Sequence, residues 1–528
     1  MRCGIIFIVC IVLASRSAEC ARILGLFPHI GKSHYIVFQS LLQALADRGH
    51  DVTTVSFFPI KNPPPNYKDV SLEGVADLGV EALDLSMFEF PSVLTKIPVL
   101  SLFLKAKVEI NILGEIGLGV CEQLVRLPTL ADAMKEEYDV ILTENFVSDC
   151  MMGILHVYGN KAPVIGLSSS IFMAWVPDRY GLNDNPAYVP IITSPYSTRM
   201  NFLQRLGNFI VNVYSKYWFH EYLQKEERAI IEKHFNTKIP DLEEIARNQS
   251  VLMLVNSFPI LNGAKPLVPS VIEVGGMHLN HTRKELPPYI EKFLNESEHG
   301  VILLSFGSLI KTSTIPKYKE DMIVNALAKL KQRVIWKFEG SGEEGTLTGN
   351  ILRVKWLPQY ELLQNKKVVA FIAHGGLLGM TEAISAGKPM VVVPFFGDQP
   401  ANAAAAAAAG FATVVPYIEL TEEKLTKALE FVLSAETRLN ARRVSSIWRD
   451  RQADPLETAV YWTERVIRWG HHAQLHSPAR DMPLYQIALL DVIATLVIAI
   501  LIILAISWYI LSKVFRLLFG RESKLKMH

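Results

Sequence analysis

A run of twenty uncharged residues near the C-terminus, 492–511, most constrains what this 528-residue chain can fold into. At 1.5 Å rise per residue a helix of this length spans about 30 Å, the thickness of a bilayer's hydrocarbon core. The alternative of a buried core helix is disfavoured because the run has no polar face. Asp481 and Asp491 precede it, and basic residues such as Lys513 and Arg516 follow it. The positive-inside rule therefore predicts a transmembrane helix over 492–511 and a cytoplasmic tail over 512–528.

The N-terminus has the pattern of a secretory signal peptide. Arg2 precedes a short apolar run, 5–14, and small residues lead to Cys20. A leader over 1–20 would be cleaved, because its apolar run is too short to anchor the chain. The sequence thus predicts a single-pass type I membrane protein whose large N-terminal part is lumenal.

Further signals agree with this topology. Three Asn-x-Ser/Thr sequons on the expected lumenal side are candidate glycosylation sites, at Asn248, Asn280 and Asn295. Lys524 and Lys526 in the tail resemble a retrieval signal, which predicts the endoplasmic reticulum membrane. Only Cys121 and Cys150 remain after the leader, so the sequence permits one disulfide and leaves their pairing open.

The charge balance excludes a class of partner. With 53 basic and 52 acidic residues the net charge is +1, which offers no field for nucleic acid. Membrane lipid and small molecules remain as partners, and self-association is left open.

Apolar runs of strand length alternate with helical periodicity in two separate parts of the chain. The first part opens as strand, helix and strand over 22–27, 33–48 and 52–58, and the second alternates in the same way from 301 onward. Such alternation predicts α/β domains with parallel sheets. The expected boundaries are 21–265 for an N-terminal domain, 266–288 for a linker, 289–470 for a C-terminal domain and 471–491 for a return and juxtamembrane segment.

Polar residues follow three expected strands of the second part, where ligands of open parallel sheets bind. Gly375 and Gly376 before a helix let backbone N–H groups approach a phosphate, and His374 can add a hydrogen bond. Glu382, further along that helix, can accept from ribose hydroxyls. Trp356 offers a flat face for a base, with the Gln359 amide beside it. No metal-ligand spacing is present, so we expect a phosphate site without metal.

The residues around these positions resemble the signature of the UDP-glycosyltransferases, and most closely that of membrane-bound animal members of the insect type. The similarity is carried by 356–359, 371–384 and 387–399, and it extends over almost the whole chain. It implies a GT-B fold, that is, two Rossmann-like domains with a cleft between them, with a UDP-sugar as co-substrate and no cofactor. By position, the resemblance implies that the UDP-sugar donor is bound by Ser308, Trp356, Gln359, His374, Gly375, Gly376, Glu382, Asp398 and Gln399.

The acceptor side rests on His34. It begins the first helix of the N-terminal part, and the positive end of a helix disfavours a charged ring, so we expect a neutral imidazole. The resemblance implies that this histidine deprotonates an acceptor hydroxyl, which displaces UDP and inverts the anomeric carbon. A carboxylate should orient the ring. In the family that the chain resembles, this carboxylate is an aspartate just after the corresponding strand. Glu144 matches that aspartate better by position and Asp149 by residue type, so both stay candidates.

These observations predict an inverting, metal-independent transfer of a sugar from UDP to a hydroxyl of small lipophilic acceptors. Glucose is the expected sugar, with glucuronic acid as the alternative donor. A membrane-tethered binding protein without turnover is the alternative from another functional class. No motif identifies the acceptor.

Overall fold

The computed structural model describes residues 20–89, 97–279, 285–473 and 475–519. The chain divides into two compact units, one ending at His476 and one beginning at Ser477. Nearly all of the expected signal peptide, the candidate glycosylation site Asn280 and the end of the tail lie outside the described residues.

The first sheet is entirely parallel and contains seven strands. In spatial order they are β3 (Tyr67–Ser71), β2 (Asp51–Ser56), β1 (Arg22–Phe27), β5 (Val140–Glu144), β6 (Val164–Ser168), β7 (Ser250–Val255) and β8 (Val271–Glu273). The central strands β5, β6 and β7 are buried at every residue. Parallel strands are covered on both faces, which explains their continuous apolar runs.

The second sheet also has seven strands, all parallel except one antiparallel edge strand. In spatial order they are β12 (Thr346–Thr348), β13 (Ile351–Val354), β11 (Arg333–Lys337), β9 (Val301–Ser305), β14 (Val368–Ala373), β15 (Met390–Val392) and β16 (Ala412–Val414). The expected pair of Rossmann-like parallel sheets is therefore present. We call the elements from β1 to β8 the first half and those from α11 to α18 the second half.

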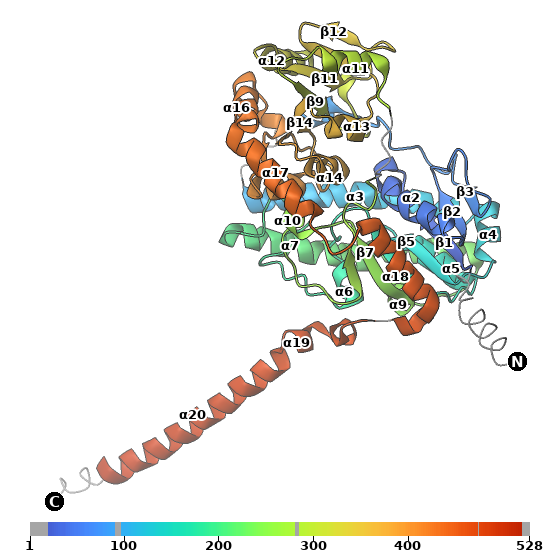
Figure 1. Ribbon diagram of the computed structural model, residues 1–528. Coiled ribbons are helices and arrows are strands. Elements are labelled where there is room, and N and C mark those ends of the chain that lie inside the picture. The colour runs from blue at the N-terminus through green and yellow to red at the C-terminus, as the bar shows by residue number, and fades with distance from the viewer. Residues whose placement is uncertain (1–19, 90–96, 280–284, 474, 520–528) are drawn as a thin grey trace, which may run out of the picture. The chain divides into compact units, whose positions relative to one another are not determined.

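Helices connect the strands of both halves (Figure 1). Those of the first half are α2 (Lys32–Asp47), α3 (Pro98–Leu124), α4 (Pro128–Met134), α5 (Cys150–Val157), α6 (Val176–Tyr180), α7 (Phe202–Trp218), α8 (Gln224–Phe235), α9 (Leu242–Gln249) and α10 (Pro259–Asn262). Those of the second half are α11 (Pro288–Asn295), α12 (Lys317–Ala328), α13 (Gln359–Gln364), α14 (Leu377–Ser385), α15 (Gln399–Ala408), α16 (Glu422–Leu433), α17 (Ala435–Arg449) and α18 (Pro455–Trp469).

Several contacts join the two halves inside the first unit. The short strands β4 (Leu83–Asp84) and β10 (Ile310–Lys311) pair in parallel. The Nζ atom of Lys105 on α3 donates to the carbonyl of Phe395 at 3.4 Å. These contacts hold the carboxyl-end loops of the second sheet against the first half.

The chain returns to the first half earlier than expected. Helix α18 packs on α2, and its Ala459, Val460 and Val466 belong to the apolar core on that face of the first sheet. Arg48 at the end of α2 donates to Glu464 at 3.2 Å. The return therefore lies in α18, before the 471–491 segment to which we assigned it.

The expected linker, 266–288, differs in a similar way. It contains β8, which pairs with β7 and closes the first sheet at one edge. This strand was not predicted because it is only three residues long and lies among Pro residues and loops. The connection between the halves is correspondingly shorter.

Cys121 and Cys150 form a disulfide between the end of α3 and the start of α5. Both residues are buried in the apolar core between these helices and the first sheet. The bond closes a loop with a sequence separation of 29, for which loop-closure entropy gives about 3–4 kcal/mol of stabilisation. The pairing that the sequence left open is thereby assigned.

The second unit contains α19 (Leu484–Ile487) and α20 (Leu490–Phe519). Within the described residues, α20 is the one helix that is long and apolar enough to cross a membrane, with a mean hydropathy of 2.8. It contains the expected span, 492–511, and none of it is buried against protein. These properties fit a single-pass membrane protein.

Candidate active site

His34 and Glu144 come together at the carboxyl ends of neighbouring strands of the first sheet. His34 lies in the first turn of α2, directly after the loop that follows β1, and Glu144 is the last residue of β5. The Nδ1 atom of His34 is 2.6 Å from Oε1 of Glu144. The Glu144 side chain is 3% exposed and that of His34 is 20% exposed. With Nδ1 bonded to the carboxylate, the ring has Nε2 left for another partner.

The pKa of His34 is shifted opposite to our expectation. Burial works against a charged ring, but the Glu144 charge and hydrogen bond together outweigh it, so the pKa of His34 lies above its usual value. The His34 charge and hydrogen bond likewise outweigh burial at Glu144 and hold the pKa of that carboxyl below its usual range. The partial charge of the helix end, on which we based a neutral ring, is a smaller effect than a carboxylate at 2.6 Å. The result is a more basic imidazole.

Three residues that the sequence did not single out surround this pair. Ser169, directly after β6, donates from Oγ to Oε1 of Glu144 at 2.9 Å, and the same Oγ lies 2.9 Å from Nδ1 of His34. The His29 ring stacks on His34 with 3.9 Å between centroids, and Phe146 meets His34 edge-on at 4.7 Å. Burial, followed by the His34 charge, lowers the pKa of His29 to about 3, so it adds a neutral ring.

Asp149, the other candidate partner of His34, binds other residues instead. It is 4% exposed, and its two oxygens accept from Arg179 at 3.1 and 2.6 Å. Gln224 donates to it at 2.7 Å, and Arg179 also pairs with Glu243 at 2.6 Å. Asp149 therefore belongs to a buried ion-pair network, and the structure places Glu144 alone of the two beside His34.

His29, His34 and Glu144 also form a group whose ligand atoms all lie within 4.8 Å of one another. Their arrangement does not suit a tetrahedral metal ion, for which imidazole nitrogens must converge on one point at about 2.0–2.1 Å. The two rings are nearly parallel, at 18°, so their in-plane lone pairs run side by side. Nδ1 of His29 accepts from the Gly31 N–H at 2.9 Å, and Nδ1 of His34 bonds Glu144. We assign no metal to this group.

The expected phosphate site lies after β9 and β14, which are adjacent in the second sheet. Gly375 has a φ of +92°, and a Cβ there would lie 2.7 Å from Val392, while a Cβ on Gly376 would lie 2.5 Å from the His374 ring. Both positions therefore require glycine. Gly376 is the N-cap of α14 and has no side-chain cap, and the Leu377 N–H at the start of that helix hydrogen-bonds the Asp398 carboxyl. Ser308 lies beyond β9, and its carbonyl accepts from the Glu81 N–H at 2.8 Å.

His374 is placed with these glycines, and burial lowers its pKa to about 4. At neutral pH its ring is therefore uncharged and can serve as a hydrogen-bond partner only. The positive end of α14 and the Lys337 charge, which also acts on His374, supply positive potential at the expected diphosphate position.

The expected base and ribose site lies beside α13 and α14. Trp356 is 62% exposed, and Nζ atoms of Lys32 and Lys337 each lie 6.0 Å from its ring centroid. Gln359, at the start of α13, donates to Oε2 of Glu382 at 2.6 Å. Burial, supported by the Glu361 charge, raises the pKa of Glu382 to about 7. An exposed indole beside a paired amide and carboxyl suits a nucleoside.

Asp398 connects this donor side with His34. It is the N-cap of α15, its Oδ2 accepts from Asn402 at 2.8 Å, and Asn402 also donates to the Gly375 carbonyl at 3.0 Å. Burial raises the pKa of Asp398, and the His34 charge acts against that shift. The charge of each group, the expected sugar-binding carboxyl of the second half and the expected base of the first, thus acts on the pKa of the other.

Gln399 is oriented differently from our expectation. Only 4% of it is exposed, and its Oε1 accepts from the backbone N–H groups of Phe395 at 2.9 Å and Phe396 at 3.4 Å. The amide oxygen therefore holds the loop that carries Asp398. Reading of sugar hydroxyls by Gln399 remains a prediction for its amide nitrogen.

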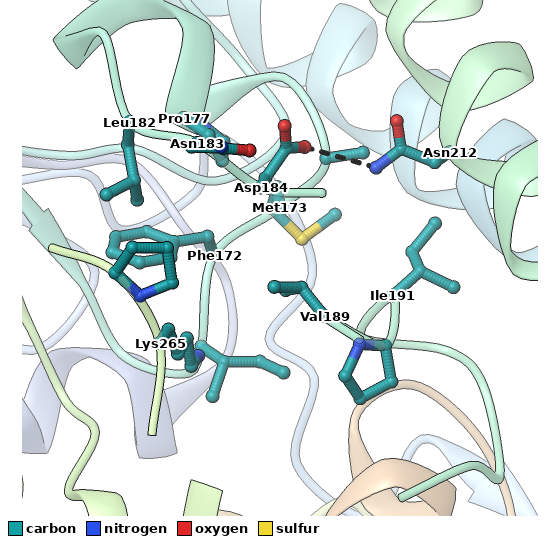
Figure 2. Close-up of a pocket in the computed structure, with 14 residues that line it drawn as sticks. Phe172, Met173, Pro177, Leu182, Asn183, Asp184, Val189, Ile191, Asn212 and Lys265 are labelled. Carbon is teal, nitrogen blue, oxygen red and sulfur yellow. Dashed lines mark hydrogen bonds between the residues drawn. The ribbon is translucent and has the colours of Figure 1, made fainter. Parts of the chain in front are cut away.

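A small cavity is lined by residues that follow Ser169 in the sequence (Figure 2). It is lined mainly by apolar residues such as Phe172, Met173 and Ile191, and Asn212 donates to Asp184 across one wall at 3.2 Å. Its volume is about 30 Å³, enough for water only. We therefore do not assign the acceptor to this cavity.

The candidate glycosylation sites that the structure describes are both at the surface. Asn248 lies on α9 and Asn295 ends α11, and both side chains are exposed. Their accessibility is compatible with modification, which stays a prediction.

Sequence reasoning missed Ser169 and His29, which follow strand ends, and Asn402, which lies within a helix. Ser169 could have been found from the rule that located the phosphate site, because it follows the apolar run of β6. Asn402 lies one helical turn after Asp398, hidden in an alanine-rich helix. His29 offered no pattern in the sequence.

Comparisons with known proteins show which proteins this chain is similar to. The family model described as "UDP-glucoronosyl and UDP-glucosyl transferase" matches residues 25–525. UDP-glycosyltransferase UGT5 of Dactylopius coccus is 36% identical over 512 residues, 96% of this chain and 95% of that protein. UDP-glucosyltransferase 2 of the same organism is 34% identical over 90% of each chain. Human UDP-glucuronosyltransferase 1A8 is 30% identical over 98% of this chain and 96% of its own.

Among solved structures, the glycosyltransferase SnogD from Streptomyces nogalater superposes with a TM-score of 0.52 at 17% identity. The match covers 84% of this chain and 99% of that chain. At this identity the similarity concerns the fold, which is GT-B, as the sequence predicted.

Proposed function

Because this chain belongs to the family of UDP-glucuronosyl and UDP-glucosyl transferases, we propose that it transfers glucose from UDP-glucose to a hydroxyl of small lipophilic acceptors with inversion. The observation that carries the proposal is the pairing of His34 with Glu144, electrostatically coupled to Asp398 of the donor side. One proton acceptor and one sugar-binding carboxyl then flank a single reaction centre. A binding protein without turnover, the alternative from another functional class, is disfavoured because the relatives described above are named as transferases.

His34 acts as the general base in this proposal. Glu144 holds the Nδ1–H tautomer, so Nε2 takes the proton as the acceptor oxygen attacks the anomeric carbon. The carboxylate then stabilises the charged ring. The bond between the anomeric carbon and the UDP oxygen breaks as the new bond forms, so an α-linked donor yields a β-linked product.

The second half would hold the leaving group. Trp356 stacks on uracil, Glu382 accepts from ribose, and the Gly375–Gly376 backbone with the α14 terminus binds the diphosphate. Negative charge that develops on UDP is met there by N–H groups and a helix end, so no metal or cofactor is required. His374, neutral at physiological pH, adds a hydrogen bond.

The charges around the sugar position favour glucose over glucuronic acid. Besides Asp398, Glu109 of α3 lies in this corner; burial, with a contribution from Asp398, raises the pKa of Glu109 to about 7. Lys105, 3.8 Å from Glu109, is the nearby cation and already has that partner. A sugar carboxylate would add a negative charge beside two buried carboxyl groups, whereas a hydroxymethyl group would not.

The location proposed is the endoplasmic reticulum membrane, with the first unit lumenal. The Cys121–Cys150 disulfide supports this orientation, because disulfides persist in oxidising compartments. The retrieval-like tail supports the organelle.

The test is a panel of UDP-sugars against simple phenols and aliphatic alcohols, with UDP release and product configuration measured on the full chain in membranes. We expect UDP-glucose to be used best, a β-linked product, and loss of turnover in His34→Ala with UDP binding retained. Glu109→Gln should raise the use of UDP-glucuronic acid relative to UDP-glucose. Retained turnover in His34→Ala, or an α-linked product, would refute the mechanism.

A further inference from the structure

Helix α7 has an inverted distribution of side chains. Its buried residues are small or polar for the most part, namely Gly207, Asn208, Val211, Ser215 and Trp218. Its exposed face is a continuous row of large apolar residues at helical spacing, which we call the α7 ridge: Phe202, Leu206, Phe209, Val213 and Tyr217. Their exposed fractions are 68, 38, 53, 49 and 66%. A helix in contact with water only would show the opposite pattern.

The inward-facing side chains of α7 make hydrogen bonds and packing contacts with the rest of the first half. The ridge is therefore exposed because these contacts fix the orientation of the helix. Asn208 is fully buried; its Oδ1 accepts from Ile191 at 2.7 Å, and its Nδ2 donates to the carbonyls of Pro186 and Val189 at 2.8 Å each. Gly207 faces α3, where Leu102 would be at ordinary contact distance, 3.5 Å, from a Cβ at this position. The rotation of α7 about its axis is therefore fixed by contacts that leave the ridge outside.

Helix α3 packs along α7 (Figure 1) and has exposed apolar residues of its own. Val108, Ile112 and Ile116 repeat every fourth residue and are 56, 56 and 40% exposed. Apolar surface on this scale marks a contact with protein or membrane, since isolated exposed residues are normal but contiguous rows are not.

We propose that the α7 ridge inserts into the surface of the bilayer, so that the first unit has a membrane contact of its own besides the α20 helix. The charges beside the ridge favour lipid over a second copy of the chain. Arg199 and Arg205 beside the ridge are exposed, whereas Lys216 is already paired with Asp178 and Asp184. Anionic headgroups complement the two arginines, whereas a symmetric dimer through the ridge would bring the same cations together.

The partner is present wherever the chain is anchored. A unit tethered to a helix that spans a membrane meets lipid at a high effective concentration, so even weak insertion is favoured. Interfacial helices with Phe, Leu and Tyr on one face lie about 5–10 Å into the headgroup region. The ridge has this composition.

The test places an environment-sensitive bimane label on the ridge of the full chain in vesicles of phosphatidylcholine and phosphatidylserine. Phe209→Cys carries the label in a chain whose Cys3, Cys10 and Cys20 are serine. Leu439→Cys on α17, 67% exposed, is the matched control. We expect nitroxide-labelled lipid to quench residue 209, with several-fold less quenching by iodide than at residue 439, and the opposite pattern at 439.

Equal quenching of both sites by iodide would show that the ridge faces water and would overturn the proposal. Shielding of residue 209 from iodide without quenching by lipid would also overturn it, in favour of a protein partner or a second copy. Leu206→Asp, in the same labelled chain, should expose residue 209 to iodide while transferase turnover with a water-soluble acceptor is kept. That turnover shows that the variant is folded.

Discussion

Replacement of Glu144 by Gln tests the chemistry of the site most directly. The change keeps the shape of the side chain and removes the charge that lies 2.6 Å from Nδ1 of His34. A hydrogen bond to a charged group contributes about 1.5–3 kcal/mol, which corresponds to about 10- to 150-fold in rate. Loss of control over the ring tautomer could raise the deficit toward about 10⁴-fold, as in hydrolytic triads. We therefore expect kcat/KM to fall by at least one order of magnitude.

The pH dependence separates this effect from general damage. The base must be neutral, so activity falls as pH decreases through the pKa of His34. Because Glu144 raises that pKa, its replacement lowers the pKa and moves the acidic limb of the kcat/KM profile to lower pH. The assay is initial-rate UDP release across pH at saturating donor, with varied acceptor.

Two controls accompany Glu144→Gln. Ser169→Ala removes one hydrogen bond to the Glu144 carboxylate, worth about 1.5–3 kcal/mol, but it keeps the charge beside His34, so the acidic limb of the profile should change little. Asp149→Asn should lower thermal stability, because it disturbs the buried pair with Arg179, and should leave the acidic limb in place. An unchanged profile in Glu144→Gln, together with a shifted one in Asp149→Asn, would refute the pairing argued here.

Three further predictions concern the donor side. Trp356→Ala should raise the KM for the UDP-sugar by about 5- to 150-fold, since stacking on a base contributes about 1–3 kcal/mol. Trp356→Phe should retain most of the affinity. Calorimetry with UDP would contradict the assignment if both variants bound UDP normally. Gly375→Ala should abolish UDP binding, because its φ of +92° and a Cβ 2.7 Å from Val392 displace the phosphate loop; Gly119→Ala, which has open space around it, should bind UDP unchanged. Exhaustive treatment with a chelator should leave turnover unaltered, and a loss restored by one divalent ion would contradict the metal-free mechanism.

Sequence reasoning succeeded where the signal lay in local order along the chain. The apolar runs of β1, β5, β9 and β14 were long and bounded by polar loops, so the polar residues after them could be placed at one edge of a sheet. Glu144 became a candidate through the family resemblance, as the residue directly after the apolar run 140–143. Asp149 became a candidate through residue type alone. The buried Arg179 that pairs with it lies 30 positions further along the chain.

Where the sequence failed, the controlling contact came from a distant segment. The raised pKa of His34 depends on a carboxylate 110 positions away, whereas the helix end that we considered is adjacent. Strand β3 was missed because its sequence at the sheet edge, Tyr-Lys-Asp-Val-Ser, is largely polar. The outward row on α7 is visible as periodicity, but periodicity does not tell which side of a helix meets the core.

The position of α18 has a consequence for how the chain can fold during synthesis. Ala459, Val460 and Val466 complete the apolar layer over α2, although more than 400 positions separate α18 from that helix. The first sheet is thus finished only after the ribosome has passed the whole second half. A chain stopped after β8 would leave the apolar face of α2 partly uncovered and prone to aggregate. The two halves therefore fold as one unit, and attempts to express the first half alone should include α18.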